Sequence, residues 1–165
     1  MKKFLLICVV TLLMPAFSFA AGTCVESGAN NPVYIYAGRD KVGEILTLLC
    51  THHTDKSLSA TIAASTMVKL SGKWVFAVKS YPGTTAPTDA TDLSIVDSDG
   101  LSLLGVADNG LNFIDATSTL ATTFYNAHMA TNSYWMPVAG EAWTISTANN
   151  AVASATFYLK FYLVP

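Results

Sequence analysis

Short apolar runs separated by turn-forming residues are the feature of this sequence that most limits its possible folds. Residues 74–81 read WVFAVKSY and end at Pro82, and a second run, LSIV, follows at residues 93–96. Asp97-Ser98-Asp99-Gly100 then forms a tight turn, because Asp and Gly tolerate the backbone conformations that turns need. Such runs are typical of antiparallel strands. We therefore predict a hairpin over residues 93–104 at the centre of an all-β domain.

Further runs of the same kind occur along the chain. Residues 44–53 (EILTLLCTHH) are apolar almost throughout, which indicates a buried strand, with a short helix as the alternative. Residues 24–31 (CVESGANN) are predicted to be a loop. The other predicted strands are residues 33–36, 57–62, 67–70, 141–147 and 154–164, the last two joined as a second hairpin. About eight strands with little helix predict an antiparallel β-sandwich, of jelly-roll or immunoglobulin-like type.

Side chains on a strand face alternately to its two sides. For the strand at residues 74–81 this alternation predicts two faces. Trp74, Phe76, Val78 and Ser80 should share one face, and Val75, Ala77, Lys79 and Tyr81 the other.

The first twenty residues have the composition of a secretory signal peptide. Two lysines precede an uncharged apolar run at residues 4–17, and Ser18-Phe19-Ala20 places small residues where signal peptidase cuts. The run is shorter than the roughly 20 apolar residues of a membrane span. We therefore expect cleavage after Ala20 and a single domain at residues 21–165, with an uncleaved anchor as the alternative. The expected location is secreted, periplasmic or at the cell surface.

The charge of the mature chain argues against two classes of partner. Without the signal peptide, seven basic residues stand against eleven acidic ones, a net charge of −4. Charged residues make up 12% of the whole chain, about half of the usual share. Nucleic acids and anionic membranes select clustered Lys and Arg, so neither is an expected partner. A surface with so few charges suits packing against neighbouring proteins.

Cys24 and Cys50 are the cysteines that remain once Cys8 leaves with the signal peptide. In an oxidising compartment an even pair predicts one disulfide, with a free thiol or an intermolecular bridge as alternatives. A closed loop of this length would stabilise the fold by roughly 3–4 kcal/mol. It would also fasten the N-terminal segment to the strand that carries Cys50.

From Trp74 onward the order of turn and strand motifs resembles a group of small β-domains encoded among the structural genes of tailed phages. The shared motifs are residues 82–89 (PGTTAPTD), 92–95 (DLSI), 97–100 (DSDG), 103–105 (LLG), 137–140 (PVAG) ahead of a strand at 143–146, and the closing strand at 157–163. The resemblance covers a little over half of the chain. It implies a virion-associated structural or decoration role, with no catalytic residues to carry over. The signal peptide and the paired cysteines depart from the pattern and favour an exported relative.

Aromatic side chains gather in and beside the long segment between residues 106 and 137, where we expect one or two helical turns. Asparagines are interleaved with them, and aromatic faces with amide groups suit carbohydrate stacking or a protein interface. The candidate binding surface consists of Phe124, Tyr125, His128, Tyr134, Trp135 and Trp143. The alternative is that Phe124, Trp135 and Trp143 close the core of the sandwich.

Acidic and imidazole side chains give weaker signals. Asp97 and Asp99 could donate oxygens to calcium, but the Glu that ends an EF-hand loop is absent. A turn held by Asx hydrogen bonds is therefore the favoured interpretation. His52 and His53 are neighbours on a strand and point to opposite faces, so we expect solvent-facing histidines rather than a metal site. No nucleophile-elbow or dinucleotide motif occurs, and neither a cofactor nor enzyme activity is expected.

These observations predict an exported, non-enzymatic structural or interaction module of a phage-related virion, a decoration layer or a surface assembly. Its partner would be a second copy or another surface or virion protein. The apolar strand at residues 154–164 would offer an exposed edge for pairing. The alternative is a secreted carbohydrate-binding module that holds a glycan with Tyr134 and Trp135. A small secreted hydrolase is the third hypothesis.

Overall fold

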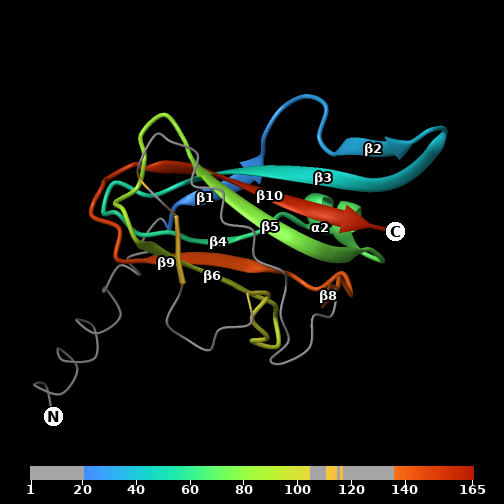
Figure 1. Ribbon diagram of the computed structural model, residues 1–165. Helices are drawn as coiled ribbons and strands as arrows, with labels where there is room; N and C mark the ends of the chain where they lie inside the picture. Colours follow the sequence, from blue (N-terminus) through green and yellow to red (C-terminus); the bar gives the residue numbers. More distant parts are fainter. Residues whose placement is uncertain (1–20, 105–110, 115, 117–135) are drawn as a thin grey trace, which may run out of the picture.

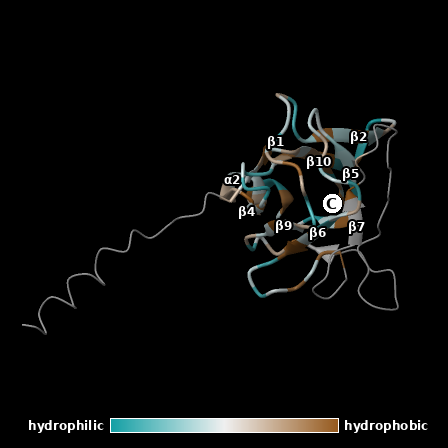
Figure 2. Ribbon diagram, turned by 90° about the vertical axis from the view of Figure 1, so that its left-hand side faces the viewer, coloured by the Kyte–Doolittle hydropathy of each residue, from teal (hydrophilic) through white to brown (hydrophobic). Residues whose placement is uncertain are grey.

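The protein is an antiparallel β-sandwich, as the sequence predicts. The computed structural model describes residues 21–104, 111–114, 116 and 136–165. Sheet A contains, in spatial order, β1 (Thr23–Glu26), β3 (Asp40–Thr51), β10 (Thr156–Val164), β5 (Trp74–Pro82) and β8 (Met136–Pro137), and β2 (Val33–Ala37) also pairs with β3. Sheet B contains β4 (Ser59–Thr61), β9 (Thr144–Ala148), β6 (Thr91–Val96) and β7 (Leu111–Ile114). The two sheets form facing layers (Figures 1 and 2).

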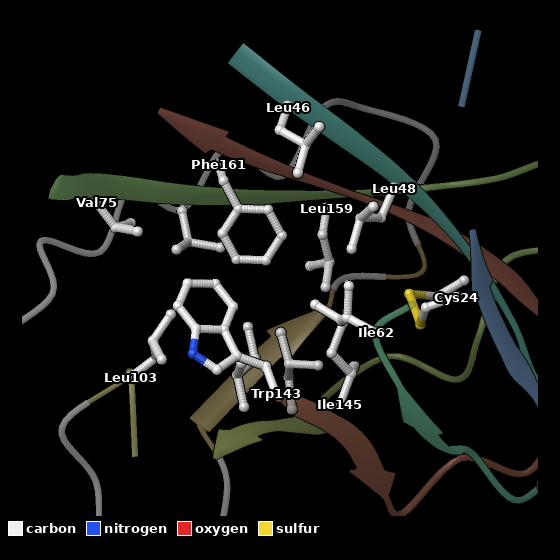
Figure 3. Close-up of a cluster of buried hydrophobic side chains, with 14 of the residues drawn as sticks. Cys24, Leu46, Leu48, Ile62, Val75, Leu103, Trp143, Ile145, Leu159 and Phe161 are labelled. Carbon is white, nitrogen blue, oxygen red and sulfur yellow. A yellow bond between two sulfur atoms is a disulfide. The ribbon is translucent and has the colours of Figure 1, made fainter. Parts of the chain in front are cut away.

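The core lies between the sheets and follows from strict alternation along the long strands. In β10, Phe157, Leu159, Phe161 and Leu163 are buried, and the residues between them are partly exposed. Figure 3 shows Phe161 and Leu159 of sheet A pointing toward Trp143 and Ile145 on the opposite side. Burial of large side chains at every second position excludes water from both inner faces.

A β-bulge in β5 changes its predicted faces. The pairing of β5 with β10 shifts between Tyr162 and Leu163 and skips residue 76. Val75 therefore joins Val78 and Ser80 on the buried side, whereas Trp74 is 40% exposed. The predicted partition of the strand into two alternating faces is wrong for its first residues, because a bulge adds one residue to one strand and reverses the alternation.

Two local predictions near the N-terminus are also wrong. Residues 23–26 form β1 rather than a loop, because Cys24 pairs directly with Cys50 on β3. Residues 67–70 belong to a helix, α2 (Ala64–Leu70), rather than to a strand. The buried residues of α2 are Thr66, Met67 and Leu70. Their spacing of three to four places one helical face against the body, which a run of only four residues did not reveal.

The predicted second hairpin at the C-terminus does not form. β9 pairs with β4 and β6 in sheet B, whereas β10 pairs with β3 and β5 in sheet A. The turn at Asn149 therefore carries the chain from one sheet to the other. β10 is an interior strand with a neighbour on each side, so the exposed pairing edge predicted for residues 154–164 is wrong.

The predicted disulfide between Cys24 and Cys50 is confirmed. It joins β1 to β3 and lies at one end of the core (Figure 3). Cys24 is 7% exposed and Cys50 is fully buried. The bond therefore adds a covalent link to an edge strand of four residues that also pairs with β3.

No helix in the described part of the chain has both the length and the hydropathy that a membrane crossing requires.

Candidate functional site

Of the six residues of the predicted aromatic surface, the structure describes one, and that residue is buried. Phe124, Tyr125, His128, Tyr134 and Trp135 lie outside the described residues. Trp143 is 3% exposed, and its ring lies 5.7 Å from that of Phe161. Trp143 is therefore a core residue, as the alternative interpretation held, and its assignment to a binding surface is wrong.

The acidic turn at residues 97–100 is held by the side chain of Asp97. An Asp97 carboxylate oxygen accepts hydrogen bonds from the backbone N–H groups of Asp99, at 3.0 Å, and Leu101, at 2.8 Å. This is the predicted Asx geometry. The chain folds back as predicted, but Val96 and Ser102 form a single bridge in place of a full strand. Among the described residues, no three His, Cys, Asp or Glu side chains gather into a metal-binding group.

His52 is buried, which corrects the expectation that it faces solvent. Its Nδ1 lies 3.0 Å from the carbonyl oxygen of Ala155, and its Nε2 lies 2.8 Å from Oγ1 of Thr147. The carbonyl can only accept, so Nδ1 carries the proton, and Nε2 then accepts a hydrogen bond from the Thr147 hydroxyl. Burial lowers the pKa of His52 and outweighs the carbonyl hydrogen bond, which raises it. The ring connects the end of β3 to both sheets.

Among the described residues, four of the eight exposed large hydrophobic side chains belong to a hairpin that projects from sheet A (Figure 1). We call residues 33–43, which comprise β2 and the first residues of β3, the arm. Its exposed large side chains are Val33 (53%), Tyr34 (49%), Tyr36 (60%) and Val42 (43%). In the described part of the chain β2 pairs with β3 alone, so its other edge has no strand beside it. A soluble domain rarely gathers such side chains without a binding role.

The two faces of the arm differ in chemistry. Tyr34 pairs with Glu44 and Tyr36 pairs with Lys41, so both tyrosines share a face with charged side chains. The Lys41 ammonium lies 4.3 Å from the centre of the Tyr34 ring, within the range of a cation–π contact. Val33 and Ile35 lie on the opposite face. The arm therefore offers one aromatic and polar face and one aliphatic face.

A buried ion pair fixes the root of the arm. The Glu44 side chain, only 4% exposed, accepts hydrogen bonds from Nζ of Lys73, at 2.6 Å, and from Nζ of Lys41. Burial alone would raise the pKa of Glu44, but the two lysines outweigh it and hold the pKa below its usual value. Lys73 also donates to the carbonyl oxygen of Lys69 in α2. The base of the arm is thus bound to the body.

The loop between β1 and β2 is held by the amide of Asn31. Its Nδ2 donates to the carbonyl oxygen of Thr47 at 2.6 Å, and its Oδ1 accepts from the Thr47 N–H at 2.9 Å. The side chain therefore occupies the place of a strand residue between β1 and β2. Lys69 on α2 donates to Glu26 at 2.5 Å and to the carbonyl oxygen of Asn31 at 3.4 Å. These contacts tie the loop to both β3 and α2.

A groove of about 390 Å³ runs beside β2. It is lined by loop residues and by three residues of the strand: Ala29, Asn30, Asn31, Pro32, Val33, Tyr34 and Tyr36. No side chain in this lining carries a formal charge. The groove and the exposed edge of β2 form one continuous surface with the tyrosine face.

The sequence contained part of the signal for this surface. Residues 33–36 were predicted as a strand, and Gly38-Arg39-Asp40 is turn chemistry. The pattern could not show that these side chains are exposed, since exposed and buried strands with apolar side chains have similar sequences. Burial in the following strand begins at Gly43 and Glu44, and neither residue type indicates it in the sequence.

The chain has little detectable similarity to known proteins. A scan against protein-family models found no match, and a search of curated proteins found no relative. Among solved structures, a chain of the capsid asymmetric unit of cyanophage Pam1 matches with a TM-score of 0.35 and 16% identity. The match covers 84% of this chain and 98% of that one. A TM-score of 0.35 is too low to establish a shared topology, so the fold stands on the strand pairings given above.

Proposed function

We propose that this chain is an exported, non-enzymatic assembly module that contacts neighbouring protein subunits through the arm. The observation that carries the proposal is the exposure of Val33, Tyr34, Tyr36 and Val42 on a hairpin with an unpaired edge in the described structure. Aromatic side chains dominate the energy of many protein interfaces. Holding them in water on an ordered hairpin is unfavourable unless a partner covers them.

The rigidity of the arm supports this function. The ion pairs of Glu44 fix its root, and the Asn31 amide fixes the preceding loop. An element that is already ordered loses less conformational entropy when it binds. The arm is therefore built as a preformed contact and not as a segment that must fold on its partner.

The proposed location and type of assembly have separate support. A disulfide persists in oxidising compartments, and the bond between Cys24 and Cys50 is consistent with export. A virion, a decoration layer or a cell-surface layer is the class of assembly that we propose, on the basis of the resemblance of the turn and strand motifs.

Solution mass across a dilution series tests the proposal. We expect the mature wild-type chain to form species larger than the monomer as its concentration rises. A variant that combines Tyr34→Ser with Tyr36→Ser should remain at the monomer mass. The control is Val68→Ser, since Val68 is 76% exposed on α2 outside the arm and should not alter the mass. A wild-type chain that stays monomeric at millimolar concentration would contradict the proposal.

A glycan is the second candidate ligand, because the groove beside β2 combines two tyrosines with the Asn30 amide. Aromatic rings stack on sugar faces and amides bond their hydroxyls. A glycan array should then show binding that is lost in Tyr36→Ala, at a protein concentration where the chain is monomeric. Equal array signals for the wild type and Tyr36→Ala would reject this candidate.

A further inference from the structure

We propose that the occupant of the arm is a second copy of this chain, paired β2 to β2 in antiparallel fashion about Ile35. Sheet A would then continue from one subunit into the next. This inference rests on the proposed assembly function and specifies its partner and its geometry.

The sequence of β2 lacks the charged residues and prolines by which many proteins prevent strand addition. Val33–Ala37 contains no charged residue and no proline. Natural edge strands are usually protected by such residues, by a covering segment or by being short and twisted. In the described part of the chain no second strand lies along β2. The edge is therefore open to another strand, which would bring its own backbone donors and acceptors.

Two copies of β2 can pair with each other in antiparallel register. Pairing about Ile35 places Ile35 opposite itself, Tyr34 opposite Tyr36 of the partner subunit, and Val33 opposite Ala37 of the partner subunit. Aromatic pairs placed directly across two antiparallel strands are favourable. No like charges face each other within the pairing, because the charged residues of the arm, Arg39, Asp40 and Lys41, all lie outside β2.

The same register brings the tip of each arm to the groove of the other subunit. The turn residues 38 and 39 of one chain fall toward residues 31 and 32 of the partner subunit, which line part of the groove of about 390 Å³. The groove carries no formal charge, and its amides and carbonyl groups can bond Arg39 of the partner subunit. Two filled grooves extend the contact beyond five paired residues, toward the roughly 1,000 Å² that stable interfaces bury.

A cysteine at the two-fold axis tests the geometry. In antiparallel pairing about Ile35 the two copies of residue 35 face each other directly, so Ile35→Cys should form an intermolecular disulfide. We expect most of the oxidised chain to run as a cross-linked dimer under non-reducing conditions, with the bond between Cys24 and Cys50 intact by peptide mapping. Val68→Cys is the matched control, because Val68 is highly exposed and lies on α2, outside the arm. Cross-linking of Ile35→Cys no greater than that of Val68→Cys would overturn the proposal.

A charge swap tests the same axis without a covalent bond. Ile35→Lys and Ile35→Glu should each be monomeric, because the two-fold axis places like charges in contact. An equal mixture should regain the dimer mass, with one chain of each kind in each dimer by native mass spectrometry. Dimers formed by either variant alone, or a mixture that stays monomeric while the wild type dimerises, would overturn the pairing.

These outcomes separate the inference from the proposed function. If the wild type associates and Tyr34→Ser with Tyr36→Ser abolishes association, the assembly function stands. Failure of both residue 35 tests would then remove only the two-fold pairing. A wild-type chain that remains monomeric at every concentration would remove both.

Discussion

The two parts of strand β3 share one backbone ladder but have different surroundings. In residues 44–51, side chains alternate between a buried and a partly exposed face, and Leu46, Leu48 and Cys50 are fully buried. In residues 40–43 the strand pairs with β2 alone among the described strands, and Val42, which this pairing skips at a bulge, is 43% exposed. The inner part has sheet B beneath it, and the arm does not (Figure 1). The buried part of β3 is therefore the part that has strands on both sides and a second layer facing it.

The first prediction contrasts the two parts by truncation. Leu48→Ala should lower the free energy of unfolding by about 3–5 kcal/mol, because it opens a cavity between the sheets. Val42→Ala should change it by less than about 0.5 kcal/mol, since an exposed side chain leaves no cavity. Urea unfolding of the monomer measures both. A loss above 1.5 kcal/mol for Val42→Ala would show that the arm contributes to the core.

The second prediction concerns the disulfide at the inner end of β3. A variant that combines Cys24→Ala with Cys50→Ala should lose about 3.5 kcal/mol of unfolding free energy, since the bond closes a loop with a sequence separation of 26. Unfolding of β1 should precede that of the body, and hydrogen exchange at residues 23–26 measures it. Exchange in the arm should not change, because its root is held by other contacts. Faster exchange across residues 33–43 would contradict that independence.

The third prediction tests the joint between the two parts. Glu44→Gln should lower the free energy of unfolding by about 1–2 kcal/mol, because a neutral amide cannot form the charge-assisted hydrogen bonds of the buried carboxylate. The loss is limited because both lysine partners still reach solvent. The larger effect should be local: amide exchange in residues 33–43 should accelerate relative to residues 46–50. Glu26→Gln is the control, because its lysine partner lies on α2 and not in the arm. Equal acceleration by both variants would deny Glu44 a specific role at the root.

The smallest expected effect is a pH dependence confined to the body. Because burial lowers the pKa of His52, the unfolded chain takes up a proton more readily than the folded chain as pH falls below about 6.5. Stability should be nearly constant above about pH 7.5 and should decline as the pH falls from about 7.5 to 5.5, a window that lies above the titration of Glu26 and Glu44. Urea midpoints of the wild type and His52→Asn measure the decline, which should be shallower in the variant. A wild-type midpoint that rises as the pH falls would contradict this sign.

Much of the sandwich could be predicted from the sequence because alternation and turn residues are local signals. β10 and the turn at Asp97 are of this kind. The predictions that are wrong concern positions where pairing with a distant segment determines the structure. β1 is a strand because Cys24 faces Cys50, and the face of Val75 depends on a bulge against β10.

The candidate site was harder to predict, because exposure is a property of layers and not of composition. The apolar residues of β10 marked it as an edge for pairing, yet it lies in the interior of sheet A between β3 and β5. β2 has similar residues and lies at the outside. The same ambiguity placed Trp143 on a surface when it belongs to the core. No local pattern distinguishes these positions, since only the arrangement of the sheets does.

Hydrogen exchange of the mature wild-type chain at two concentrations tests the central claim, that the arm is the contact surface, most directly. Samples at a concentration where the chain is monomeric and at one where it associates are compared under otherwise identical conditions. We predict slower exchange of backbone amides in residues 33–37 on association, with no change in α2. Association that leaves the exchange of residues 33–43 unchanged, or that slows exchange only elsewhere, would contradict the account.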